Sequence, residues 1–279
     1  MTDRAIRDVI IFVTVMVVAG WIGVLINLAM QVSEPMESLG VLLWLLVPPI
    51  TAILLSVRAG TWMQRLGLGL GASGSGKWYF LALLATPIAV ALLLPLALFS
   101  GALKFVGTGQ VGIVELGVTF LFSAAIKNVF EEICWRGFLT PRLEETRFAG
   151  LANHIITGLV WALWHVPYWL FFLSAAEITS HAALPVWGLI VVAFFIMPMQ
   201  AILYGELRLI TGSVWPPYVL HTISNVVTML FLSGGMFELH SPFGALVSPG
   251  TSGILYSIIL AGAGLWLYRK RSELEKGAE

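Results

Sequence analysis

Long apolar stretches separated by short polar connections run through the whole chain. Each stretch approaches the roughly 20 apolar residues that an α-helix needs to cross a bilayer. There are eight such stretches, at residues 10–30, 41–57, 78–103, 111–135, 151–173, 185–207, 214–232 and 254–268. The pattern predicts an all-α, polytopic membrane bundle of about eight transmembrane helices, with residues 1–279 forming a single integral membrane domain.

Lysine and arginine are concentrated in every second connection between these stretches. One side of the predicted bundle would carry Arg4, Arg7, Arg58, Arg65, Lys77, Arg136, Arg142, Arg147, Arg208, Arg269, Lys270, Arg271 and Lys276. The connections on the other side contain little more than Lys104. Because short loops rich in Lys and Arg stay in the cytoplasm, we predict that both termini are cytoplasmic and that the protein is a multi-pass protein of the cell membrane.

The composition supports this class and excludes others. Hydrophobic residues make up 58% of the chain and charged residues 11%, with a formal net charge of zero. Soluble domains have about 45–50% apolar and about 25% charged residues. A neutral, apolar chain of this kind is not expected to bind nucleic acid, and its main partner is the lipid bilayer. The single cysteine, Cys134, excludes an internal disulfide and a cysteine-based zinc cluster.

The most polar stretch within an apolar segment is residues 127–136, Lys-Asn-Val-Phe-Glu-Glu-Ile-Cys-Trp-Arg. On a helix, Lys127 faces Glu131 and Glu132 faces Arg136, since each pair is four residues apart. Ionisable groups within the membrane cost roughly 2.5–3.5 kcal/mol each on insertion scales, so they indicate function. We predict that one glutamate is a buried general base and the other is structural. The alternative is that both are hydrated at the cytoplasmic interface.

Two later segments contribute polar groups suited to hydrolysis. His165 lies within the fifth segment, and His221 and Asn225 share one helical face of the seventh. A carboxylate in a low-dielectric site can act as a general base near neutral pH, so Glu131 and His165 could hold a water between them. His221 and Asn225 could donate hydrogen bonds to an oxyanion, at roughly 2.7–4 kcal/mol for each donor.

These motifs, in this order, resemble the CPBP membrane proteases, a family that includes CAAX prenyl endopeptidases and bacteriocin-processing or immunity proteins. The resemblance rests on Glu-Glu-x-x-x-Arg, an aromatic residue four positions before a histidine, and His-x-x-x-Asn, within residues 127–225. The aromatic residue is usually Phe and here is Trp161. The resemblance implies an eight-helix intramembrane fold with a catalytic core at about residues 111–232.

The same resemblance implies an activity and assigns roles. It implies a glutamate-dependent peptidase that needs no metal and no cofactor and cleaves a prenylated or otherwise hydrophobic peptide or protein. The implied catalytic residues are Glu131 and His165, which would activate water, and His221 and Asn225, which would stabilise the oxyanion. Glu132 and Arg136 would support them.

Other motifs offer alternative chemistries. Residues 71–77 have the Gly-x4-Gly-Lys spacing of a phosphate-binding loop, but Trp78 replaces the Ser or Thr that binds magnesium. The same residues contain Gly-Ala-Ser-Gly, which is similar to the serine motif of rhomboid proteases, and we interpret the stretch as a flexible linker. Glu131, His165 and His221 could also form a zinc site, since catalytic zinc uses Glu-His-His ligands.

Two functions without peptide hydrolysis remain as alternatives. A scaffold or immunity protein of the same fold would use the polar cluster structurally. A transporter would use the two adjacent glutamates as carriers, but transporters commonly show repeat symmetry, which this sequence does not show. Four residues suited to hydrolysis in family order favour the peptidase.

Overall fold

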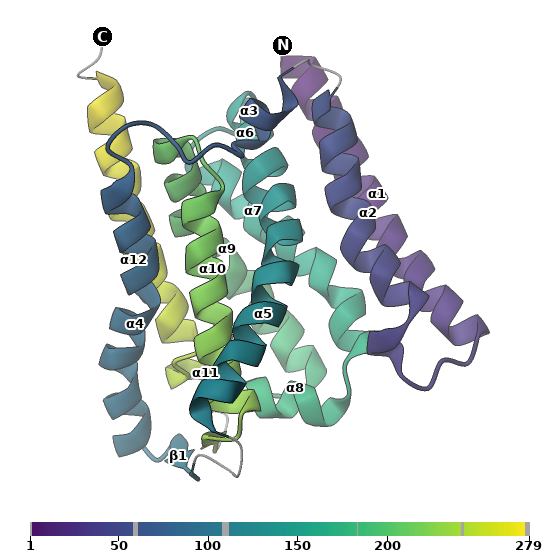
Figure 1. Ribbon diagram of the computed structural model, residues 1–279, viewed down its shortest axis with the longest axis vertical. Helices are drawn as coiled ribbons and strands as arrows, with labels where there is room; N and C mark the ends of the chain where they lie inside the picture. The colour runs from purple at the N-terminus through teal and green to yellow at the C-terminus, as the bar shows by residue number, and fades with distance from the viewer. Residues whose placement is uncertain (1, 58–60, 108–111, 183, 241–242, 277–279) are drawn as a thin grey trace.

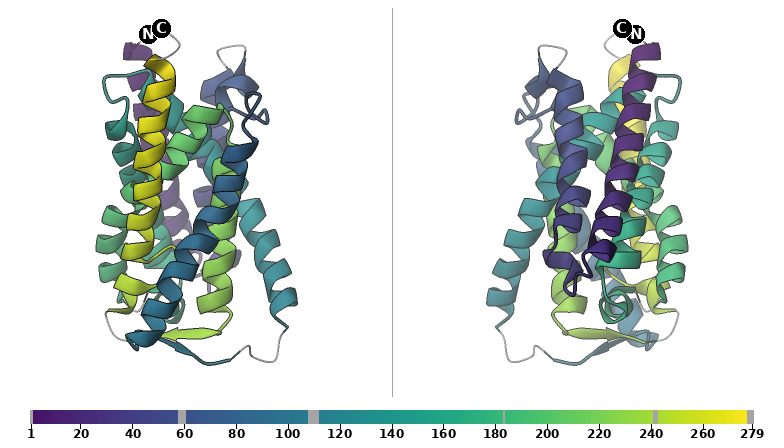
Figure 2. Two further views of the ribbon diagram at one scale, coloured as in Figure 1. Left: turned by 90° about the vertical axis from the view of Figure 1, so that its left-hand side faces the viewer. Right: turned by 90° about the vertical axis from the view of Figure 1, so that its right-hand side faces the viewer.

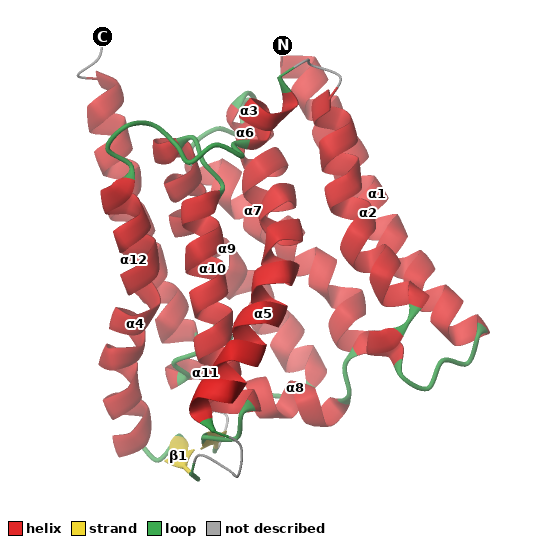
Figure 3. Ribbon diagram, in the orientation of Figure 1, coloured by secondary structure: helices red, strands yellow, loops and turns green. Residues whose placement is uncertain are grey.

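The computed structural model describes residues 2–57, 61–107, 112–182, 184–240 and 243–276, and its long helices lie side by side in one bundle (Figure 1, Figure 3). Eight helices correspond to the eight predicted segments. They are α1 (Thr2–Ala29), α2 (Leu39–Val57), α4 (Gly76–Phe99), α5 (Ile113–Glu132), α7 (Leu151–Pro167), α9 (Val186–Thr211), α10 (Trp215–Thr228) and α12 (Ile254–Lys276). The all-α bundle is thus confirmed.

Short elements connect or extend these helices. The short helices are η1 (Pro35–Glu37), α3 (Trp62–Leu66), α6 (Thr140–Glu144), α8 (Ala175–Ala182) and α11 (Gly244–Val247). Three π-helical segments, η2 (Ile133–Leu139), η3 (Tyr168–Phe172) and η4 (Met229–Ser233), continue α5, α7 and α10. The strands β1 (Leu103–Phe105) and β2 (Phe237–Leu239) pair antiparallel, with Lys104 opposite Glu238. The hydropathy pattern did not predict this ribbon.

The long helices make this a multi-pass membrane protein. Within the described residues, six helices are long and apolar enough to cross a membrane, and α10 and α12 are not among them. The end of α12 is charged, and α10 carries the polar residues of the seventh segment. Both termini lie at the same end of the bundle (Figure 2), as an even number of spans requires. The count of eight membrane spans and the cytoplasmic location of the termini stay predictions. Two residues on which these predictions rest, Arg58 and Val111, lie outside the described residues.

Helix α9 packs against α7, α10 and α12. Between α2 and α7, the Trp44 ring stacks on Trp164 with ring centroids 4.0 Å apart. Each indole N–H donates to the other residue's carbonyl oxygen, at 2.8 Å from Trp44 and 3.2 Å from Trp164. Helices in lipid associate through close packing and interhelical hydrogen bonds rather than through the hydrophobic effect. These contacts therefore hold the helix that carries His165.

The contact between α7 and α9 depends on one glycine. A Cβ added to Gly158 would lie 2.3 Å from the Cα of Pro198 and 2.5 Å from its nitrogen, so only a glycine permits this approach. We expect Gly158→Ala to lower the free energy of unfolding by about 1–3 kcal/mol, because overpacking forces the backbones apart. Unfolding in detergent micelles measures this. Gly262→Ala on α12 is the control, since an added Cβ there meets no atom within 4 Å. Equal loss in both variants would contradict the prediction.

The glycine-rich stretch at residues 67–76 is held against the start of α10. Ser213 Oγ donates to the carbonyl oxygen of Gly69 at 2.6 Å, and Trp215 Nε1 donates to that of Leu68 at 2.8 Å. These bonds involve Leu68 and Gly69, so the interpretation of residues 71–77 as a flexible linker stays a prediction.

Candidate active site

Glu131 lies near the end of α5 and is 1% exposed. One carboxylate oxygen, Oε1, is 2.5 Å from Lys127 Nζ. The other, Oε2, accepts hydrogen bonds from the indole nitrogens of Trp161 at 2.8 Å and Trp135 at 3.4 Å. Donors from α5, η2 and α7 therefore fix both the position and the plane of this carboxylate.

Glu132 points to a different set of partners. Its Oε1 is 2.9 Å from Arg136 Nη1 and 2.8 Å from His221 Nδ1. Arg136 is fully buried, and its guanidinium lies 4.5 Å from the ring centroids of both Trp161 and Tyr204. Arg136 lies in the π-helical segment η2, a distortion that is frequent at functional sites. The predicted Glu132–Arg136 contact is present, and Glu132 also holds His221.

His165, on the last turns of α7, is oriented by its own helix. Its Nδ1 is 3.0 Å from the carbonyl oxygen of Trp161. A carbonyl oxygen only accepts, so Nδ1 carries the proton and Nε2 has a free lone pair. The ring also stacks on Trp169, with centroids 5.0 Å apart. Trp161 thus contacts both Glu131 and His165, which are not bonded directly to each other among the described hydrogen bonds.

Asn225, a predicted site residue, belongs to a chain of hydrogen-bonded polar residues. This chain was not predicted from the sequence. Its Nδ2 donates to Asn128 Oδ1 at 3.0 Å, and Asn128 Nδ2 lies 3.4 Å from Thr222 Oγ1. Asn128 is fully buried and lies three residues before Glu131. A buried amide needs hydrogen-bond partners. An asparagine at position 128, within an apolar segment, could therefore have indicated a polar partner on another helix.

These side chains meet at one end of a cavity of about 580 Å³. Lys127, Trp161, His165, Tyr204, His221 and Asn225 line that end. Along α9 the wall continues from Tyr204 to Leu189, fifteen residues or about 22 Å at 1.5 Å per residue. The far part is mostly apolar. Glu131 lies behind Lys127 and Trp161, which separate it from the open space.

The predicted site residues therefore fall in two layers. His165, His221 and Asn225 line the cavity, while the other three lie behind its wall. Glu131 and Glu132 bond to residues that line it, and the Arg136 guanidinium lies over two of the lining rings. In the part of the chain that the structure describes, no group of three or more His, Cys, Asp or Glu is arranged to hold a metal ion. The Glu131 oxygens already bond to Lys127 and to indoles.

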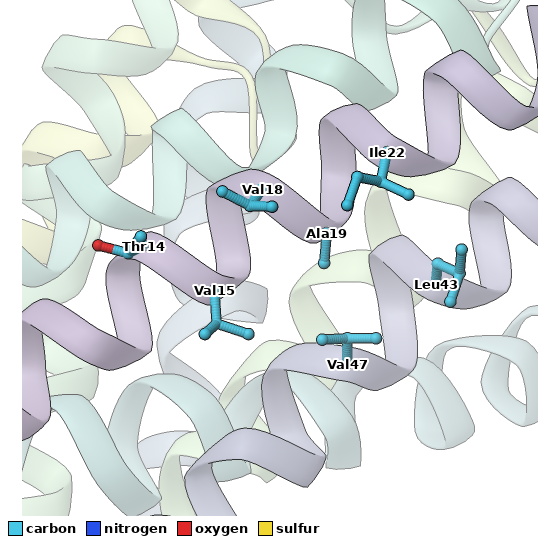
Figure 4. A pocket seen from close by; sticks show the side chains of 7 residues that line it. All are labelled: Thr14, Val15, Val18, Ala19, Ile22, Leu43 and Val47. Atoms are coloured by element: carbon cyan, nitrogen blue, oxygen red, sulfur yellow. The ribbon is translucent and has the colours of Figure 1, made fainter.

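A second hollow lies far from this chemistry. It has a volume of about 360 Å³ and lies between α1 and α2 (Figure 4). Val15, Val18, Ile22, Leu43 and Val47 form most of its wall. It brings no pair of groups together that could perform acid–base chemistry.

Fold and site together define a polytopic membrane protein in which a buried carboxylate and two histidines adjoin a cavity. The family of type II CAAX prenyl endopeptidases described as Rce1-like matches residues 113–227, from the first turn of α5 to near the end of α10. Residues 113–227 are therefore similar to this family of CAAX-type membrane proteases, and the resemblance seen in the motifs is confirmed. No curated protein matches the chain.

Proposed function

We propose that this protein is an intramembrane endopeptidase that hydrolyses a peptide bond with a water activated by Glu131 and His165. One observation carries the proposal. A carboxylate fixed by three donors lies directly behind a cavity wall that presents His165, His221 and Asn225. The match to an endopeptidase family over these residues supports the same reaction.

The position of the proton on the His165 ring allows this residue to bind the attacking water. With the Nδ1 proton of His165 donated to the Trp161 carbonyl, Nε2 can accept a hydrogen bond from a water in the cavity. When the Lys127 ammonium moves away from Glu131 Oε1, Glu131 takes the proton of that water as the oxygen attacks the scissile carbonyl carbon. The same proton then passes from Glu131 to the leaving amine, so the acid and the base are one group.

Asn225 and His221 are suited to stabilise the tetrahedral intermediate. One N–H of the Asn225 amide is bonded to Asn128, and the second N–H is available to the cavity. His221 Nδ1 bonds Glu132, so Nε2 can donate to an oxyanion only when both ring nitrogens carry protons. Each preorganised donor would contribute roughly 2.7–4 kcal/mol.

The cavity suits a hydrophobic substrate. Its far wall includes Ile178 and Leu189, and its length of about 22 Å would hold six or seven extended residues at about 3.3–3.6 Å each. We therefore propose a prenylated or otherwise hydrophobic, membrane-associated peptide as substrate. The reaction would need no metal, and the catalytic core would comprise about residues 111–232 of a single integral membrane domain.

Cleavage of a fluorogenic farnesylated CAAX peptide by the purified protein in detergent tests this function. We expect cleavage by the wild type that a strong chelator leaves unchanged. Loss of cleavage with chelator and its return with zinc would instead make Glu131, His165 and His221 metal ligands. A folded wild type that cleaves neither this peptide nor an unprenylated apolar peptide would contradict the proposal and favour a scaffold, immunity or transport role.

A further inference from the structure

Gln200, on α9, is a polar side chain in a mostly apolar part of the cavity wall. It is 3% exposed and lines the cavity. Its Nε2 donates hydrogen bonds to the carbonyl oxygen of Thr251 at 2.7 Å and to Ser257 Oγ at 2.8 Å. The Ser257 hydroxyl donates its own proton to the carbonyl oxygen of Gly253 at 2.8 Å, so it can only accept from Gln200. Both N–H groups of the amide are therefore used, and the orientation of the amide is fixed.

The carbonyl oxygen of the same amide is left for a ligand. In the part of the chain that the structure describes, the side-chain hydrogen bonds of Gln200 are the two that Nε2 donates, so Oε1 accepts none. This oxygen is not fully enclosed by the protein, and its residue lines the cavity. An acceptor without a donor is costly in an apolar site. A ligand that displaces water from this part of the cavity must therefore supply a donor.

The group that anchors the Gln200 amide is itself held in place. The backbone N–H of Thr251 donates to Thr228 Oγ1 at 3.0 Å, and the Thr228 hydroxyl donates to the carbonyl oxygen of Ser224 at 2.8 Å. Residues of α9, α10 and the connection before α12 thus fix the amide together. A preorganised group loses little freedom when a ligand binds, so Oε1 is a ready acceptor at a defined place in the wall.

We propose that Gln200 Oε1 accepts a hydrogen bond from one backbone N–H of a peptide bound in the cavity, and that it thereby selects a peptide chain over a purely apolar chain at this level. The inference rests on the proposed peptidase function for its place in the reaction, although the binding itself does not require catalysis. Each peptide residue other than proline offers one backbone N–H, whereas a hydrocarbon chain offers none. The neighbouring wall residues of α9, Ala193, Ile196 and Met197, are apolar and suit apolar side chains.

The spacing along α9 relates this contact to the reacting bond. Gln200 precedes Tyr204 by one helical turn, four residues or about 6 Å at 1.5 Å per residue. The Tyr204 and His221 ring centroids are 5.7 Å apart, so Tyr204 lies at the level of the reacting groups. Two extended residues, at about 3.3–3.6 Å each, cover the distance from there to Gln200. The N–H that Gln200 binds therefore belongs to a residue about two positions from the scissile bond.

A scan with backbone esters tests the contact in the full-length protein in detergent. In an apolar fluorogenic peptide, each amide within about two residues of the scissile bond is replaced singly by an ester, which removes one N–H and keeps the chain length. We expect the wild type to lose about 5–100-fold in kcat/KM at one position, the range for an acceptor left without its donor. Gln200→Met should cleave this ester and the all-amide peptide alike. Gln64→Met, at an exposed position of α3, is the matched control and should keep the wild-type pattern. Mass spectrometry of the products verifies that the same bond is cleaved.

Equal cleavage of all the esters by the wild type would overturn the contact, and this result does not depend on whether Gln200→Met folds. A loss at the same position that persists in Gln200→Met would overturn it as well. Calorimetric binding of the same peptides to Glu131→Gln separates this inference from the proposed function. A Gln200-dependent preference for the all-amide peptide, in a protein whose wild type cleaves nothing, would overturn the peptidase alone. Glu131-dependent cleavage in which no ester position depends on Gln200 would overturn the Gln200 contact alone.

Discussion

Replacement of Glu131 by Gln is expected to lower kcat/KM for peptide cleavage by roughly 10²–10⁴-fold, the range that a positioned acid–base group contributes. Gln has the same shape, and its amide oxygen can still accept a hydrogen bond from Trp161, whose indole lies 2.8 Å from Oε2. It cannot take a proton from water. Lys127 is partly exposed to the cavity, so it can turn there once the carboxylate charge is gone.

The control for this loss lies on the same helix. Glu115 is exposed in the first turn of α5, far along the helix from the cavity end, so Glu115→Gln should cleave at the wild-type rate. Both variants should unfold at the wild-type temperature in detergent. A Glu131→Gln protein that is folded and cleaves within threefold of the wild-type rate would contradict the role of Glu131 as general base.

Replacement of Arg136 by Met is expected to cause the largest loss of stability, about 3–5 kcal/mol in the free energy of unfolding. Removing one member of a buried ion pair leaves the other charge buried without compensation. Arg136 is fully buried, and its loss would leave Glu132 with only His221 as a charge partner at Oε1. The guanidinium also fills the space between the Trp161 and Tyr204 rings. Denaturant-induced unfolding in micelles measures the difference.

Two further variants show whether charge is the cause. Arg147→Met, at an exposed position, should change the free energy of unfolding by no more than about 0.5 kcal/mol. The double variant Glu132→Gln with Arg136→Met should be more stable than Arg136→Met alone, because it leaves no unpaired carboxylate. The contrary result is a loss of unfolding free energy in the double variant that equals the sum of the losses in Glu132→Gln and Arg136→Met. That result would show that packing, and not charge, makes Arg136 necessary.

The fold could be predicted where local pattern decides it. Apolar stretches of spanning length became the eight long helices, because hydropathy and length are properties of each segment by itself. Local pattern did not predict the contacts of Leu68 and Gly69. Their carbonyl oxygens accept hydrogen bonds from Trp215 and Ser213, which lie 147 and 144 residues away in the sequence. The ribbon of β1 and β2 was missed for a similar reason, since each strand has only three residues and its partner is remote.

For the candidate site, residue identities could be predicted and several contacts could not. The spacing of four residues correctly predicted the Lys127–Glu131 and Glu132–Arg136 pairs. The departure from Phe to Trp161 looked minor in the motif. In the structure the Trp161 indole donates to Glu131, a bond that Phe cannot make.

The sequence by itself determined the helical segments, the order of the polar motifs and the pairs within one helix, because each depends on residues no more than a few turns apart. The tertiary structure decided which glutamate meets which partner from other helices. Glu131 meets Trp161, Glu132 meets His221 and Asn128 meets Asn225 across 30, 89 and 97 positions of sequence. Those contacts depend on how α5, α7 and α10 pack. The same packing places Lys127 on the cavity wall and Glu131 behind it, a distinction that two residues on one helical face do not reveal in the sequence.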